Sequence, residues 1–561
     1  MVYLYFLIIF LILFSTLSPT VGLIDCGEII FGIHYLNILH PTGYPLFTLL
    51  GRIFSFLPFL EPAFKGNLFS FLFGFFTIIL LYFLIKKITQ DNIVSLIYVT
   101  LFSFNNLFWS IVNEIEVYSL TAFFLVLLIY LFLKKEEKNI FLFIAYVLGI
   151  SLTHHLMLLS IVLPMILYFI LKEKKKLFLF IISFLIGFSL YFYLLIRANS
   201  DPIFNWGNPK DFLRLFWHIS GRQYRVWSFS LPINEVIKNF VNEISFLIKE
   251  MIYIYFLFAI IGIYFLFQKN RELAIILIIT IIIGILNSIN YSIPDIQPYY
   301  LPAFIPLIIF SSYGFSHIKI FSQKIIRFLI LFITLLILLV FNYPKNNKRD
   351  FYLAYDFTYN VLNSLPKNSL ILTDWWDFYS SSLYFRYLKN FRKDLIIIDK
   401  ELLRRTFYLE YLRKTYPDFI SKIKRELEEY EKYLYQFEYN KLKEPWGIQN
   451  AYINLLISFI ETKKENAYLV YLNLNDPDLK AFLTNKKVIP YFLTFQIKDT
   501  LECQYYDFKN LYYRKPKKIL DERENLVIDY YKKMVNANIY FLEKLGKKEE
   551  INELKEVLKK F

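Results

Sequence analysis

Two carboxylates and a histidine near the N-terminus form the pattern best suited to acid–base chemistry. Asp25 and Glu28 lie three residues apart, directly after an apolar segment, and the run His40-Pro-Thr-Gly-Tyr-Pro45 follows them. Ionisable residues beside a bilayer are costly and are usually kept for chemistry or transport. A carboxylate that accepts a proton from a hydroxyl makes that oxygen a better nucleophile. We therefore expect Asp25 to be a catalytic base with Glu28 beside it; the alternative is that Asp25 caps the next helix.

The run from His40 to Pro45 combines two prolines with a glycine, which predicts a rigid turn before a helix along the membrane surface. His40 either donates to a phosphate oxygen or pins this turn. Arg52, further along the same helix, is the better anion ligand by type, because its charge is permanent and its fork fits phosphate.

Two further polar clusters precede or separate apolar segments. In the first, Glu116 either orients an acceptor or a cation, or belongs with Tyr118 to a belt of aromatic residues at the membrane interface. In the second, His154 and His155 contact a phosphate, hold a metal or supply simple interfacial polarity. A metal site there would need further ligands that the spacing does not reveal.

The loop of residues 197–244 combines arginines with aromatic residues, among them Trp206, Arg222, Tyr224 and Arg225. Guanidinium groups neutralise phosphate while rings stack on sugar faces, so the loop is suited to a sugar phosphate. It is equally suited to an interfacial helix that touches anionic lipids. Asp295, in a later polar loop, is the last of the candidate site residues.

The elements that must position these residues are membrane helices. The chain has 561 residues, of which 57% are hydrophobic and 20% aromatic, far above the values of a soluble protein. About 20 apolar residues cross a bilayer, and eleven spans are expected, near 3–24, 67–85, 92–109, 119–133, 139–153, 156–171, 177–196, 245–267, 273–290, 301–316 and 326–342. We expect the first to be an uncleaved span, with a cleaved signal peptide as the alternative.

The charge pattern orients the protein. The net charge of +15 comes partly from lysines and arginines clustered between spans, whereas the short connections 110–118, 154–155 and 291–300 contain none. Positive loops stay on the cytoplasmic side, so the polar clusters are expected on the outer face of the cell membrane. The charge orients the chain and does not indicate nucleic acid binding.

Residues 343–561 differ from the rest because they are rich in charge and contain short β-like runs, namely Leu370–Thr373, Leu395–Asp399, Ala467–Asn473 and Val488–Gln496, with amphipathic helical patterns between and after them. We expect a polytopic α-helical membrane domain over residues 1–342 and an extracytoplasmic α/β to α-rich soluble domain over residues 343–561.

Other chemistries have little support. The two cysteines, Cys26 and Cys503, form no CxxC, so neither a disulfide framework nor a cysteine metal site is indicated, although a single long-range bridge between them stays open. No nucleotide-binding or common hydrolase motif occurs in a suitable context. No cofactor is expected; a divalent cation is conceivable, but the sequence does not support one.

Taken together, the polar segments resemble the GT-C superfamily of membrane glycosyltransferases, and within it the protein O-mannosyltransferase-like branch. The resemblance covers residues 20 to about 300 and rests on Asp25-Cys-Gly-Glu28, His40-Pro-Thr-Gly-Tyr-Pro-Leu-Phe47, Phe108-Trp109 with Glu116-Val-Tyr118, His154-His155, Asn205-Trp-Gly-Asn-Pro209 with Tyr224, and Asn290-Tyr291 with Asp295.

The resemblance implies that Asp25 is the base and that the donor is a polyprenyl-phosphate sugar held in the membrane. The expected reaction is inverting transfer of a hexose, with mannose the expected sugar, to a hydroxyl of an exported protein. Alternatives are transfer to a lipid or polysaccharide, a transporter or flippase, and a receptor with a membrane anchor. Transporters often bind substrate near the bilayer midplane and show internal repeats, whereas here the polar clusters lie at one face.

Overall fold

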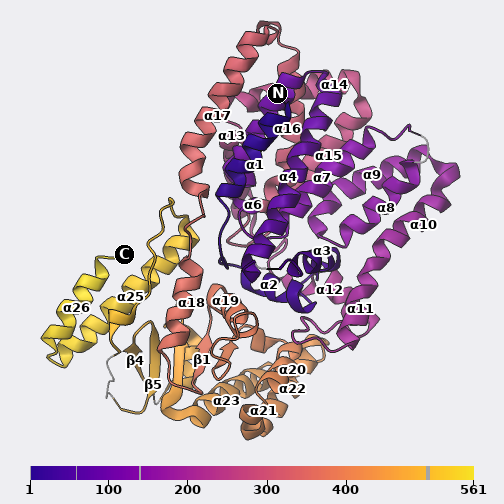
Figure 1. The fold of residues 1–561 in the computed structure, drawn as a ribbon. Helices are drawn as coiled ribbons and strands as arrows, with labels where there is room; N and C mark the ends of the chain where they lie inside the picture. Colours follow the sequence, from indigo (N-terminus) through magenta and orange to yellow (C-terminus); the bar gives the residue numbers. More distant parts are fainter. Residues whose placement is uncertain (1, 59, 138–139, 485, 501–505) are drawn as a thin grey trace.

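The computed structural model describes residues 2–58, 60–137, 140–484, 486–500 and 506–561. Its N-terminal part is a bundle of apolar helices, drawn from indigo through magenta to salmon in Figure 1. These are α1 (Val2–Ser15), α2 (Cys26–Tyr35), α3 (Pro45–Ser55), α4 (Pro62–Thr89), α5 (Asn92–Phe104), α6 (Asn106–Val112), α7 (Tyr118–Phe132), α8 (Ile140–Leu152), α9 (Leu159–Lys172), α10 (Leu177–Phe188), α11 (Phe192–Asn199), α12 (Phe212–Ile219), α13 (Ile233–Glu250), α14 (Ile254–Lys269), α15 (Arg271–Ile289), α16 (Leu301–Ser316) and α17 (Lys324–Asn346).

Within the described ranges, four helical segments are long and apolar enough to cross a membrane: α4, residues Lys174–Asn199, α15 and α17. Two bent pairs, α5 with α6 at 64° and α13 with α14 at 101°, raise the number to six. The expected eleven spans exceed this number because several of them are shorter helices, such as the 15 residues of α7 and the 13 of α8. Helices of this length fall short of the ~20 residues that cross a bilayer unaided.

The first expected span, 3–24, is helical only as far as Ser15. Residues 16–24 continue as buried irregular chain, and Pro19 within them has no backbone N–H for a helical ladder. Asn67 of α4 donates to the carbonyl oxygens of Ser18 (2.8 Å) and Thr20 (3.1 Å). Irregular backbone within a membrane domain requires such partners from the protein, and this segment delivers Asp25 to the end of the bundle.

The C-terminal part is an α/β unit around a five-stranded sheet. Its elements are α18 (Leu353–Ser364), β1 (Leu370–Thr373), α19 (Trp376–Tyr387), β2 (Ile396–Asp399), α20 (Thr406–Thr415), α21 (Pro417–Ile420), α22 (Lys424–Glu438), α23 (Pro445–Lys463), β3 (Ala467–Val470), α24 (Pro477–Phe482), β4 (Lys487–Tyr491), β5 (Thr494–Lys498), α25 (Glu522–Lys544) and α26 (Lys548–Leu558).

The strand order is β2-β1-β3-β5-β4. β1 pairs in parallel with β2 and β3, whereas β5 pairs antiparallel with β3 and β4. The apolar run 488–496, expected as one β segment, is a hairpin that turns at Phe492 and Leu493. Strands β1 to β3 are buried throughout, as expected for strands covered on both faces.

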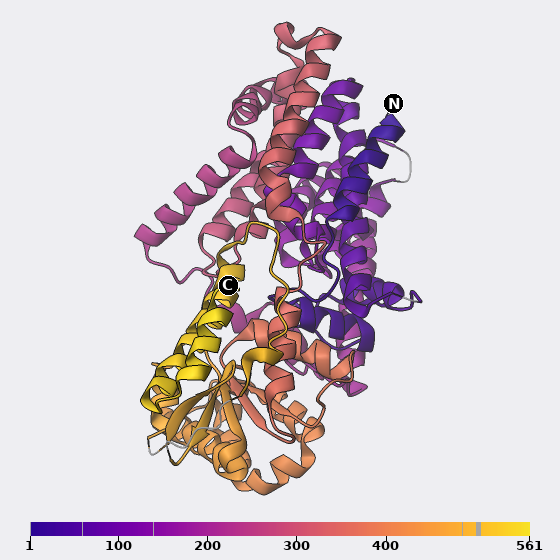
Figure 2. The ribbon, with the colours of Figure 1, turned by 60° about the vertical axis from the view of Figure 1, so that its left-hand side comes forward.

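The short helices α2, α3 and α12 lie between the apolar bundle and the C-terminal unit (Figure 1), and Figure 2 shows the same arrangement from a second direction. Helix α19 packs directly on α2. Gly27 permits this approach, because a Cβ atom there would lie 2.0 Å from the carbonyl oxygen of Ser380. Residues separated by about 350 positions in the chain thus meet at the end of the bundle.

Candidate functional site

Asp25 stands at the first turn of α2 but does not cap it. Its side chain makes no hydrogen bond to the helix N-terminus. Instead, Oδ1 accepts a hydrogen bond from Trp376 Nε1 (2.6 Å), and Oδ2 lies 3.8 Å from His40 Nε2. Burial raises the pKa of the Asp25 carboxyl, while His40 opposes the rise, Glu28 adds to it and Trp376 opposes it. The carboxylate is therefore a stronger base than an exposed aspartate, with one hydrogen-bond donor, Trp376, and one neighbouring cation, His40.

His40 is fixed by Glu28. Both carboxylate oxygens of the buried Glu28 accept from this one residue, Oε1 from the backbone N–H (2.8 Å) and Oε2 from Nδ1 (2.7 Å). Burial alone would lower the pKa of His40, but Glu28 and Asp25 outweigh it and raise the pKa to about 9. The imidazole is thus a cation at neutral pH, paired with Glu28 and close to Asp25.

Two cavities meet at this group. The first, here called the membrane cavity, has a volume of about 630 Å³ and extends among η1 (Leu156–Leu158), α9 and α15. The second, the domain cavity, has a volume of about 820 Å³ and extends toward η7 (Leu402–Arg404), α22 and α23 of the C-terminal unit. Asp25, His40 and Tyr224 line both cavities. A carboxylate at such a junction can act on one molecule while a second occupies the other side.

The membrane cavity brings together Glu116, Tyr118, His155 and Asp295 from three separate segments. His155 Nδ1 accepts from the backbone N–H of Met157 (3.0 Å). Burial and His40 lower the pKa of His155 to about 3, so its ring is neutral and carries its proton on Nε2. That N–H is a donor suited to a phosphate oxygen.

Apolar side chains from the helices continue the membrane cavity away from Asp25. They include Leu159, Leu163, Ile283 and Leu286. Among the described residues that line this cavity, none is a lysine or arginine. His40 therefore supplies its cationic charge.

Two other expected site residues, Arg52 and His154, lie elsewhere. Arg52 donates to the carbonyl oxygen of His34 and lies over the Phe56 ring. His154 is buried, with Nε2 2.9 Å from the Val117 carbonyl oxygen. Each therefore has a local structural contact in place of a position at the cavity.

The arginines of the 197–244 loop do not line the membrane cavity. Arg222 donates to the carbonyl oxygen of Glu438 (2.8 Å) and stacks over the Trp217 ring, 3.8 Å from its centre. Arg225 is exposed on the same loop. Trp206 lines the domain cavity and donates to Gln223 (3.0 Å). The aromatic and basic pattern of this loop thus serves mainly to dock the C-terminal unit.

Helix α19 supplies contacts that the sequence-based prediction missed. Besides the bond from Trp376 to Asp25, Asp377 accepts from the backbone N–H of Ile24 (2.6 Å) and from Arg523 (2.9 Å). Ser380 accepts from the backbone N–H of Glu28 (3.0 Å). The available signal was the run Thr373-Asp-Trp-Trp-Asp377 directly after a strand, since ligands gather at the carboxyl ends of parallel strands.

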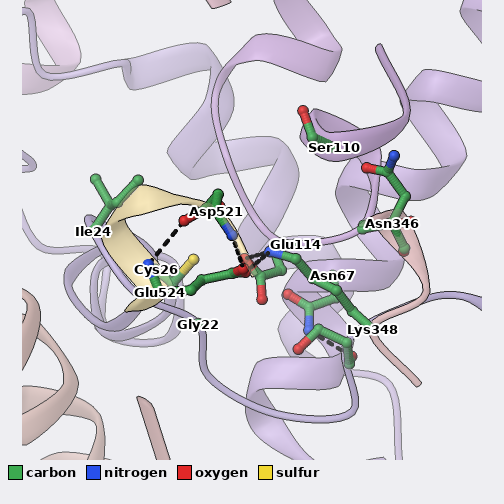
Figure 3. A network of polar contacts seen from close by, with 12 residues as sticks. Gly22, Ile24, Cys26, Asn67, Ser110, Glu114, Asn346, Lys348, Asp521 and Glu524 are labelled. Atoms are coloured by element: carbon green, nitrogen blue, oxygen red, sulfur yellow. Dashed lines mark hydrogen bonds and ion pairs between the residues drawn. The ribbon is translucent and has the colours of Figure 1, made fainter. Parts of the chain in front are cut away.

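A network of buried ion pairs links the segment before Asp25 to α25 (Figure 3). Lys348 donates to Glu114 (2.7 Å) and lies 3.7 Å from Glu524, which also pairs with Lys518. A Cβ atom on Gly22 would collide with the Glu114 carboxylate at 2.7 Å. Burial alone would lower the pKa of Lys348, but Glu114 and Glu524 raise it above its ordinary value. The segment before Asp25 is thus held on both sides.

Asp25, Glu28 and His40 also have the spacing of a metal site, with ligand atoms within 4.8 Å of one another. The two Glu28 oxygens are, however, both engaged by His40, and a protonated imidazole is not a ligand. The group is therefore better suited to an ion pair. Cys26 is buried with a free thiol, and Cys503 lies outside the described residues.

Comparison with known proteins supports a relation to glycosyltransferases. Residues 25–178 match the family model described as the protein O-mannosyl-transferase TMEM260 N-terminal domain. Protein O-mannosyl-transferase TMEM260 of Mus musculus is 35% identical over 116 residues, which cover 20% of this chain and 16% of that protein. Its Dictyostelium discoideum namesake is 24% identical over 454 residues, 69% of this chain and 55% of that protein. The chain thus spans about half, or less, of these relatives.

Among solved structures, ArnT from Cupriavidus metallidurans bound to undecaprenyl phosphate has a TM-score of 0.52 and 11% identity, and the match covers 89% of this chain and 98% of ArnT. This likeness confirms the expected fold class, a polytopic helical membrane fold of the GT-C type. The chain therefore has a polytopic helical membrane fold of the GT-C type and is similar, over part of its length, to protein O-mannosyl-transferases.

Proposed function

We propose that this protein is an inverting glycosyltransferase that moves a hexose, with mannose the expected sugar, from a polyprenyl phosphate to a hydroxyl of an exported protein. The observation that carries the proposal is the position of Asp25 at the junction of two cavities. The printed names of the relatives and the fold of ArnT support the reaction class.

The membrane cavity is suited to the donor. Its apolar walls match an isoprenoid chain, and its polar end offers His40, the His155 N–H and tyrosine hydroxyls to a sugar phosphate. A charged donor group and a preorganised N–H aimed at a leaving phosphate stabilise the charge that develops there. The domain cavity then receives the acceptor, because it leads from Asp25 into the C-terminal unit.

In the proposed reaction the acceptor oxygen attacks the anomeric carbon as its proton passes to Asp25. The bond between that carbon and the phosphate oxygen breaks, the electron pair leaves with the polyprenyl phosphate, and the configuration inverts. The neighbouring His40 cation favours the ionised form of Asp25, since it opposes the rise of the carboxyl pKa that burial causes. No nucleotide takes part.

We also infer an active site on the outer face of the cell membrane, from the charge pattern of the connections, and a division into residues 1–342 and 343–561. A lipid or polysaccharide acceptor is the alternative within the same chemistry. A transporter is less well supported, because the acidic residues and histidines that line the membrane cavity lie in connections between helices and not at helix midpoints.

The test uses purified protein in detergent with polyprenyl-phosphate mannose and threonine-containing acceptor polypeptides. We expect a mass increment of one hexose on the acceptor. Asp25→Asn should reduce turnover at least ~10²-fold, because it removes the proton acceptor while keeping the size of the side chain. Donor binding should change little. A folded, membrane-inserted Asp25→Asn protein with near-parental turnover would overturn the assignment of the base.

A further inference from the structure

The domain cavity contains a cation without a carboxylate partner. Its walls are mainly aromatic and aliphatic, and its two arginines, Arg404 and Arg405, are adjacent in the chain. Arg404 is paired, with Asp478 at 2.7 Å and Glu401 at 3.3 Å. For Arg405, no ion pair occurs with any residue that the structure describes, and its one side-chain hydrogen bond goes to the carbonyl oxygen of Arg404 (3.2 Å).

The nearest candidate partner for Arg405 is already engaged. Both carboxylate oxygens of Glu438 accept from Thr406, at 2.8 Å from its backbone N–H and 2.7 Å from its hydroxyl, and Arg214 lies 3.5 Å away. Burial lowers the pKa of Arg405, and Glu438 offsets only part of that shift. A half-buried guanidinium with most of its donors free at a cavity wall is available to a ligand that supplies an anion.

The position of Arg405 relative to the two cavities indicates which molecule supplies that anion. Arg405 lines the domain cavity and not the membrane cavity, into which the apolar walls would direct a lipid-linked donor. The aromatic residues around Arg405, among them Trp206, Tyr430 and Phe437, are typical of surfaces that bind a polypeptide.

From these contacts we propose that Arg405 is a specificity-determining residue that binds an acidic side chain of the acceptor polypeptide, near the hydroxyl that receives the sugar. The inference rests on the proposed function and deepens it by naming a preference among acceptors. The planar guanidinium pairs with a carboxylate through two parallel hydrogen bonds, which favours an aspartate or glutamate over an amide.

The experiment measures binding and transfer separately on the full-length protein. The probes are fluorescent peptides with one central threonine and a single glutamate at successive flanking positions, each matched by a glutamine peptide. We expect at least one glutamate peptide to bind the parent protein about 10- to 100-fold more tightly than its glutamine partner, the range for a hydrogen bond to a charged group. Arg405→Gln should remove this difference.

Two further variants test whether the preference for glutamate peptides depends on Arg405 itself. Arg404→Gln is the matched control, since Arg404 lines the same cavity but is already paired, and it should keep the preference. Arg405→Glu should reverse the preference toward peptides that carry lysine. This reversal cannot arise from a simple loss of folding.

Equal binding of glutamate and glutamine peptides by the parent protein, or an unchanged preference in Arg405→Gln, would overturn the inference. So would a weaker affinity of Arg405→Gln for the polyprenyl-phosphate donor with the acceptor preference intact, because Arg405 would then be a phosphate ligand. Failure of the proposed function is distinguishable: peptides would bind with the expected preference, yet no hexose would be transferred to any of them.

Discussion

Replacing Glu28 with glutamine should change how the stability of the protein depends on pH. The raised pKa of His40 is a measure of how strongly the folded state favours the imidazolium ion. Each pKa unit corresponds to about 1.4 kcal/mol, so the rise from 6.5 to about 9 corresponds to about 3 kcal/mol at most. His40 is 12% exposed and Glu28 1%, so solvent screens this pair little.

The direction in which stability changes with pH follows from linkage between protonation and folding. Because the folded-state pKa exceeds the unfolded value, this stabilisation is fully present below pH 6.5. It declines between about pH 6.5 and 9 and is lost above that window. Glu28→Gln removes the largest source of the rise, so its stability should vary much less over the same window. Asp25 still acts on His40, and a smaller slope should remain.

The measurement is the apparent melting temperature in detergent between pH 6 and pH 9.5, followed by tryptophan fluorescence. Glu114→Gln is the matched control, since it also removes a buried carboxylate but leaves a lysine as the partner. The pKa of Lys348 lies above its ordinary value, so Glu114→Gln should lower the melting temperature without changing its pH dependence in this window. Parallel curves for the parent protein and Glu28→Gln would refute the reasoning.

Two other predictions concern the base and the orientation. Trp376→Phe removes a hydrogen bond that lowers the pKa of Asp25. The acidic limb of the profile of kcat/KM against pH should therefore move to higher pH, whereas Trp446→Phe, at a residue 81% exposed, should leave it unchanged. An unmoved limb in a folded Trp376→Phe protein would mean that Asp25 is not the titrating base. In a background without Cys503, a cysteine at the exposed Asn450 should be labelled in intact cells, and one at Lys175 only after permeabilisation. Labelling at position 175 in intact cells would reverse the proposed orientation.

The sequence was most informative where membrane chemistry restricts residue types. Asp25, His40, Glu116 and Asp295 stand out because charges are rare beside apolar segments, and the structure places all four around one cavity. The arginine-rich loop was ambiguous for a physical reason. Guanidinium and aromatic side chains serve ligand binding and domain docking equally well, and Arg222 proved to bind a carbonyl oxygen of the C-terminal unit.

Contacts between distant segments lie beyond what periodicity can reveal. The bond between Trp376 and Asp25 joins residues 351 positions apart, and no local pattern encodes such a pair. The hairpin at Phe492 was missed because apolar residues continue through the turn, which lacks the usual Gly or Asn signal, while Pro490 lies within β4. The helix boundary at Ser15 was missed because the irregular segment after it carries no charged residue, and hydropathy does not record backbone geometry.

The fastening of Asp25 to α19 and α25 also sets the order of events during biosynthesis. Asp25 leaves the ribosome 351 residues before Trp376, which at roughly 5–20 residues per second is a delay of about 20–70 seconds. During that interval apolar helices can already enter the bilayer, yet the carboxylate lacks its tryptophan donor and the domain cavity lacks its far wall. A chain interrupted before α19 would be a membrane-inserted but catalytically incomplete product. The proposed site is thus complete only after the C-terminal unit has been synthesised.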